Sequence, residues 1–120
     1  MKVTPVRFTR DVAAMRRFLS ALGLAGTQSS EDGSWVSLEA AGGGEVGLHD
    51  VATAAAPREA GTTDLAFSTT EPLETVAARL QDAGFPARVD GRVLHVTDPD
   101  ERDVQVHGAE LDLHGYSEGD

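Results

Sequence analysis

Two histidines, His49 and His107, each end a short stretch in which an acidic residue is followed by alternating apolar and small or polar residues. The stretches read Glu-Val-Gly-Leu-His at 45–49 and Asp-Val-Gln-Val-His at 103–107. A neutral imidazole can orient a ligand, exchange a proton near neutral pH or bind a divalent metal. Two interpretations follow: the histidines serve a ligand site, or they are solvated residues at strand ends.

Trp35 and Asp64 are the other side chains with chemistry to offer. Trp35 is the single tryptophan of the chain; facing a pocket, its indole forms a flat wall for a planar ligand, and facing outward it belongs to a core or an interface. Asp64 either contributes a carboxylate to a site or is a solvated strand end. The chain has no cysteine and hence no thiol chemistry. The glycine-rich residues 41–45 are interpreted as a hairpin turn, without the following helix that a phosphate-binding site needs.

The overall charge narrows the range of partners. Twenty acidic residues against ten basic ones give a formal net charge of −10, which repels nucleic acids and anionic membranes and attracts cationic ligands. The first residues lack an apolar secretion signal, and no run of apolar residues is long enough to span a membrane. We therefore expect a cytoplasmic protein that binds neither nucleic acid nor membrane.

The elements that must position these side chains occur in the same order in both halves of the chain. Helical spacing predicts helices at 11–24 and 71–85, and each ends in a glycine followed by an apolar residue. Strand alternation predicts one strand before each helix and three strands after it. The segment 34–50 aligns with 92–108 without a gap, so we interpret the chain as a duplication.

The duplicated unit is a βαβββ module, because each half reads strand, helix and three strands. The modules span residues 1–50 and 63–108, with a linker at 51–62 and an acidic tail at 109–120. One such module leaves a face of its sheet uncovered, so two modules must join to close a core. The chain length of 120 residues fits one domain of this kind, at 1–108.

Two βαβββ modules, Leu-Gly-Leu at 22–24 and Asp-Pro-Asp at 98–100 together resemble the vicinal oxygen chelate superfamily of glyoxalases, bleomycin-resistance proteins and extradiol dioxygenases. The resemblance covers nearly all of residues 1–108. It implies an α+β fold in which the two modules form a cupped, eight-stranded mixed sheet with the helices on the outer face. It also implies that a ligand pocket lies on the concave face.

Strand alternation then sorts the side chains between the helices and the pocket. The side chains expected to pack toward the helices are Val36, Leu38, Val46, Leu48, Leu65, Phe67, Leu94, Val96, Val104 and Val106. The side chains expected to line the ligand pocket are Trp35, Ser37, Glu39, His49, Asp64, His95, Gln105 and His107.

The superfamily's metal site, where present, takes a histidine or glutamate from the first, fourth, fifth and eighth strands. The resemblance places Thr4, Gly47, Asp64 and Gln105 at these positions. Only Asp64 is a good ligand for a divalent ion. We therefore expect no metal cofactor, and a divalent metal, if bound, would have to use the different set His49, Asp64 and His107.

Three functions are compatible with these residues. The first is a small-molecule binder without metal, similar to the antibiotic-sequestering members of the superfamily. The second is a divalent-metal-dependent lyase, isomerase or dioxygenase-like enzyme that uses His49 and Asp64. The third is a domain whose pocket has no present chemistry, and the fold alone does not choose among them. We also expect a homodimer, because members of the superfamily usually pair and the first strand has an exposed edge.

Overall fold

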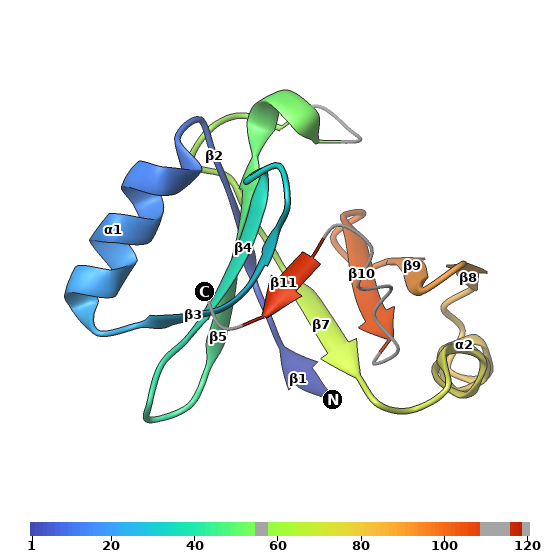
Figure 1. The fold of residues 1–120 in the computed structure, drawn as a ribbon. Coiled ribbons are helices and arrows are strands. Elements are labelled where there is room, and N and C mark those ends of the chain that lie inside the picture. The colour runs from blue at the N-terminus through green and yellow to red at the C-terminus, as the bar shows by residue number, and fades with distance from the viewer. Residues whose placement is uncertain (55–57, 109–115, 119–120) are drawn as a thin grey trace. The chain divides into compact units, whose positions relative to one another are not determined.

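The computed structural model describes residues 1–54, 58–108 and 116–118. These residues form two compact units, each containing one βαβββ module (Figure 1). The N-terminal module comprises residues 4–64 with the strand at 116–118, and the C-terminal module comprises residues 1–3 and 65–108. The predicted α+β fold with two βαβββ modules is therefore confirmed.

The N-terminal module has a six-stranded sheet in the order β11-β3-β4-β5-β2-β6. Strand β2 runs parallel to β5, and the other neighbours are antiparallel. The elements are β2 (Val6–Thr9), α1 (Val12–Leu22), β3 (Ala25–Ser30), β4 (Trp35–Glu39), β5 (Glu45–Asp50), the 3₁₀ turn η1 (Val51–Thr53), β6 (Thr63–Asp64) and β11 (Tyr116–Glu118). The turn η1 and strand β11 lie in segments that the sequence assigned to the linker and the tail.

The C-terminal module has a five-stranded sheet in the order β1-β7-β10-β9-β8. Strand β7 runs parallel to β10, as β2 does to β5 in the other module. The elements are β1 (Lys2–Val3), β7 (Ala66–Thr69), α2 (Leu73–Asp82), β8 (Ala87–Asp90), β9 (Val93–Thr97) and β10 (Asp103–Gly108). The equivalent pairing of the two modules agrees with the duplication inferred from the sequence.

Two strands that the sequence indicates as continuous are each divided between the sheets. The first breaks into β1, which pairs with β7, and β2, which pairs with β5 and β6. The fifth breaks into β6 and β7 at Leu65, which belongs to neither strand. The prediction that Leu65 packs beneath a helix is wrong, because the side chain at this break is 52% exposed. Its predicted companion Phe67 does pack against the buried core.

Helix α1 begins and ends where its flanking residues require. The Asp11 carboxylate accepts a hydrogen bond from the Ala14 backbone N–H at 2.9 Å, which satisfies one of the free donors of the first turn. Gly23 has a φ of 113°, a left-handed conformation that ends the helix and that side chains other than glycine disfavour. Figure 1 shows α1 lying along the N-terminal sheet.

The two hydrophobic cores confirm the predicted helix-facing sides of the strands. In the N-terminal module Val12, Met15 and Leu19 of α1 pack against buried Val36, Leu38 and Leu48. In the C-terminal module Leu73 and Val76 of α2 form a buried cluster with Leu94 and Val106. Alternation along a strand then places the intervening side chains on the opposite face of each sheet, which we call its non-helical face.

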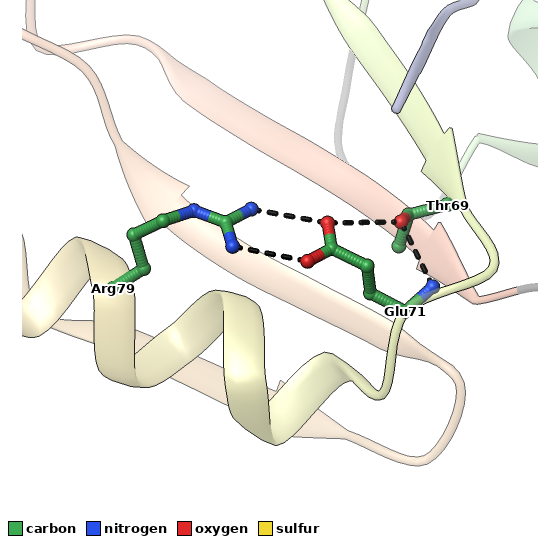
Figure 2. A network of polar contacts seen from close by, with 3 residues as sticks. All are labelled: Thr69, Glu71 and Arg79. Atoms are coloured by element: carbon green, nitrogen blue, oxygen red, sulfur yellow. Dashed lines mark hydrogen bonds and ion pairs between the residues drawn. The ribbon is translucent and has the colours of Figure 1, made fainter.

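A polar network holds the start of α2, where Pro72 makes no side-chain cap. The Glu71 backbone N–H donates to Thr69 Oγ1 at 3.1 Å, and the two Arg79 terminal nitrogens donate to the Glu71 carboxylate at 3.0 and 3.1 Å. Figure 2 shows the guanidinium facing both carboxylate oxygens. The hydrogen bonds from Arg79 lower the pKa of Glu71, so the carboxylate is ionised when it braces this turn.

Candidate functional site

The non-helical face of the N-terminal sheet brings together residues from three neighbouring strands. The strand register places Trp35 opposite His49, and His49 beside Phe8. We call these three side chains the aromatic row. The adjacent row, one step along the strands, holds Ser37, Gly47, Val6 and Asp64.

The absence of a side chain at Gly47 leaves room for the indole of Trp35. A Cβ atom built on Gly47 would lie 2.1 Å from Cη2 of Trp35, and 2.7 and 2.9 Å from two further ring atoms. Distances this short show that the indole lies directly over the Gly47 backbone. The glycine therefore has a packing role, because any side chain at this position would displace the ring. The position that the resemblance assigns to a metal ligand is thus covered by an aromatic ring.

The imidazole of His49 lies between the other two rings of the aromatic row. Its centroid is 6.1 Å from that of Trp35 in an edge-to-face arrangement, and 5.5 Å from that of Phe8 at an interplanar angle of 37°. These distances fall in the range of favourable aromatic pairs. His49 Nδ1 is 2.8 Å from the backbone carbonyl oxygen of Asp50, so the ring is also fixed by a polar contact.

An ion pair closes the Phe8 end of the aromatic row. Arg58 Nε donates to Asp64 Oδ2 at 2.9 Å, and the two side chains are 25% and 18% exposed. The Arg58 guanidinium carbon lies 5.5 Å from the centroid of Phe8, within the range of a cation–π contact. Asp64 is therefore engaged with a guanidinium, and the two opposite charges balance locally.

Phe8 and Arg58 are the site residues that the sequence analysis missed. The position of Phe8 could have been found from the strand pattern. In β2 the larger apolar residues, Val6 and Phe8, share the face of Gly47 and His49, whereas in β4 and β5 the larger apolar residues pack toward α1. Arg58 lies in a segment without helical or strand periodicity, so no sequence pattern indicated that its side chain contacts Asp64.

Two other predicted pocket residues of this module have different surroundings. Ser37 is 4% exposed, and its hydroxyl contacts Thr27 Oγ1 at 2.8 Å. The hydroxyl thus links β4 to β3. Glu39 is the last residue of β4 and is exposed. Neither residue contributes to the aromatic row.

The remaining predicted pocket residues, His95, Gln105 and His107, lie on the non-helical face of the C-terminal sheet. His95 is opposite Gln105, and His95 Nδ1 is 3.7 Å from Asp103 Oδ2. Burial lowers the pKa of His107, and the nearby His95 lowers it further, so His107 is neutral at pH 7.

A shallow hollow of about 290 Å³ lies beside His95, and its lining consists of Pro86, Ala87, Arg88, His95, Val96, Thr97 and Asp103. The structure thus brings Trp35 and His49 together in the N-terminal module, and His95, Gln105 and His107 together in the C-terminal module.

A bound metal ion needs several ligating side chains grouped together. Within residues 1–54, 58–108 and 116–118, no three His, Cys, Asp or Glu side chains are grouped as a metal site would require. In the same described ranges, no helix is long and apolar enough to span a bilayer.

Comparison with known proteins bears on the fold. Neither a protein-family model nor a curated protein matches the sequence. A crystal structure of an NAD-dependent benzaldehyde dehydrogenase from Legionella pneumophila is 16% identical, with 88% of this chain and 97% of that chain covered and a TM-score of 0.66. A glyoxalase/bleomycin resistance protein/dioxygenase superfamily member from Vibrio splendidus is also 16% identical, with 88% and 96% covered and a TM-score of 0.56.

The chain has the fold of the vicinal oxygen chelate superfamily. The fold predicted from the module order and the two short motifs is therefore confirmed. At this level of identity the likeness extends to the fold alone. The different names of the two similar structures also agree with the general rule that one fold hosts many chemistries. The function of this chain must be argued from its own side chains.

Proposed function

We propose that the protein binds a small planar organic molecule against the aromatic row, without using a metal. The observation that carries the proposal is the indole of Trp35 lying over Gly47, beside the His49 imidazole. Ligand sites in proteins combine aromatic and apolar walls with a few polar groups that fix orientation. Trp35 and Phe8 supply the walls, and His49 supplies the polar group.

Binding without metal is supported by what occupies the family's ligand positions in this module. Gly47 offers no donor atom and is covered by the indole. Asp64 offers a carboxylate, but Arg58 holds it at 2.9 Å. A divalent ion would have to displace the guanidinium from Asp64, and removing a partner from a charge pair is costly where water is partly excluded.

The local charge balance also suggests which ligands fit. The net charge of the chain, −10, would favour cations at long range. At the Phe8 end of the aromatic row, however, the Asp64 carboxylate is neutralised by Arg58. A neutral planar molecule therefore fits the immediate surroundings better than the cationic ligand that the overall composition favours.

The enzyme alternative, which uses His49 and Asp64 around a divalent ion, requires Asp64 to be released from Arg58. Nicotinamide chemistry, which the name of the Legionella structure includes, has no support in this chain. The residues 42–47 match the pattern Gly-x-Gly-x-x-Gly, but they lead from β4 into the antiparallel strand β5, whereas a dinucleotide-binding loop opens a helix. Elemental analysis of protein purified without chelator or nickel resin distinguishes metal-free ligand binding from the metal-dependent enzyme. One divalent ion per chain, lost in Asp64→Ala, would establish the alternative.

Ligand binding can be followed through the single tryptophan. A panel of planar aromatic compounds, both neutral and cationic, should include some that quench Trp35 emission saturably. The variant Phe8→Ala should weaken their binding, because it removes one wall of the site. The matched control is Phe18→Ala on α1, which makes the same chemical change at a side chain that is 60% exposed. Equal effects of the two variants, or no saturable quenching across the panel, would contradict the proposal.

Homodimer formation, which the resemblance implies, stays a prediction. Sedimentation equilibrium at micromolar concentration should give the mass of two chains. The mass of one chain would contradict the prediction.

A further inference from the structure

We infer that the neutral imidazole of His49 is held as the tautomer protonated on Nδ1, and that its Nε2 selects planar aromatic ligands carrying a hydroxyl or ring N–H donor. This inference rests on the proposed function, because it names the ligand class of the same site. It assigns His49 the role of a specificity-determining hydrogen-bond acceptor.

The tautomer follows from the chemistry of the partner atom. His49 Nδ1 lies 2.8 Å from the carbonyl oxygen of Asp50. A carbonyl oxygen has no proton and can only accept a hydrogen bond, so Nδ1 must be the donor. A neutral imidazole has one N–H group, and Nε2 therefore carries a lone pair. The assignment depends on hydrogen-bond chemistry and requires no observation of the hydrogen itself.

The carbonyl that selects the tautomer is itself anchored. The Asp50 backbone N–H donates to the Ser34 carbonyl oxygen at 2.9 Å. The Asp50 side chain accepts from the Ala52 N–H, also at 2.9 Å, at the start of η1. These contacts hold the Asp50 residue on both sides, and they keep its carbonyl directed at the imidazole. Asp50 therefore acts as a positioning residue for His49.

The other ring nitrogen is available to a ligand. Among the described residues, no side chain or backbone group forms a hydrogen bond with His49 Nε2. The ring is flanked by Trp35 and Phe8, whose aromatic carbons offer Nε2 no hydrogen bond. An aromatic ligand held by these rings can satisfy Nε2 only if it carries a donor at its edge.

Ligands without such a donor should be rejected. An ether or carboxylate oxygen at the same place opposes one lone pair with another and leaves Nε2 without a partner. Sites built to accept a hydrogen bond discriminate strongly against analogues that cannot donate one. We expect at least about a tenfold loss of affinity on replacing the hydroxyl of a ligand by a methoxy group.

The tautomer can be tested without a ligand. Long-range proton–nitrogen correlation spectra of ¹⁵N-labelled protein distinguish a ring nitrogen that carries hydrogen from one that carries a lone pair. In the pH range where the ring is neutral, the His49 spectrum, assigned by its loss in His49→Gln, should show hydrogen on Nδ1. Hydrogen on Nε2, or a mixture of both forms, would overturn the inference whatever the protein binds.

The ligand class can be tested with phenol and anisole, which differ in the hydroxyl hydrogen. Titrations followed by amide chemical shifts in β4 and β5 should give at least about tenfold tighter binding of phenol. In His49→Phe, which keeps a ring but removes the acceptor, the two compounds should bind alike. Equal binding by the unsubstituted protein overturns this inference and leaves the proposed function standing. Absence of binding by both compounds overturns the ligand class, whereas the proposed function is overturned only when no compound of the whole panel quenches Trp35 emission saturably.

Discussion

Replacing Gly47 with alanine tests the packing on which the proposed site depends. The added methyl group would lie 2.1 Å from Cη2 of Trp35, closer than any two carbon atoms approach without a bond. Gly47 is not among the residues with positive φ, so its backbone accepts an alanine. The cost must come from the ring, and overfilling a packed position of this kind costs about 1–3 kcal/mol.

The assay is urea unfolding of Gly47→Ala, followed by circular dichroism and by Trp35 emission. The unfolding free energy should fall by about 1–3 kcal/mol, and the folded-state emission should shift to the red as the ring moves into water. In a Trp35→Leu background the obstacle is absent, so the same substitution should change stability by less than about 0.5 kcal/mol. The difference between the backgrounds is the coupling between the two residues.

Gly108→Ala is the matched control, because Gly108 also lies in a strand. A Cβ at this position would meet Leu73 Cδ1 at 3.5 Å, which is ordinary contact, and stability should change by no more than about 0.5 kcal/mol. If Gly47→Ala instead left both the stability and the Trp35 emission unchanged, the indole could not lie over Gly47. The wall of the proposed ligand site would then be absent.

Three further predictions concern stability. Asp11→Ala should cost about 1 kcal/mol of unfolding free energy in urea, and Asp11→Asn much less, because Asp11 caps α1 through the Ala14 N–H. Leu38→Ala should cost about 2–5 kcal/mol in the same assay, because the side chain is 0% exposed and its removal leaves a cavity. Burial and His95 lower the pKa of His107 below its ordinary 6.5, so the unfolded chain binds the proton more readily and stability should fall as pH drops from about 6.5 toward the folded-state pKa. Subtracting the pH profile of His107→Gln should isolate this slope, and identical profiles would contradict the prediction.

Residue periodicity was sufficient to predict both helices, most of the strands and most of the side chains that face the helices. Val36 and Leu48 were predicted to face a helix, and both pack beneath α1. Gly23 was predicted to end that helix, and its positive φ does so. These features were predictable because spacing within a strand or helix decides which side chains share a face, and because few residues adopt the left-handed conformation.

Pairing across long distances could not be predicted in the same way. Alternation identifies a strand but does not say which sheet each part of it joins, so the break at Leu65 was missed. Phe8 and Arg58 lie in different parts of the sequence from His49 and Asp64, and they meet through the register of β2 and through the fold of the linker. The sequence therefore predicted the site residues in β4 and β5, Trp35 and His49, but not Phe8 in β2 or Arg58 in the linker.

The division of the first and fifth strands means that the repeated sequence is not a separable piece of the protein. Strand β1 belongs to the C-terminal sheet, where Lys2 pairs with Ser68, and β6 belongs to the N-terminal sheet, where Asp64 pairs with Val6. Cutting the chain within the linker would leave β2 and β7 each with an unpaired edge, the kind of edge that promotes aggregation. A gene fragment that encodes either half alone should therefore yield an insoluble product.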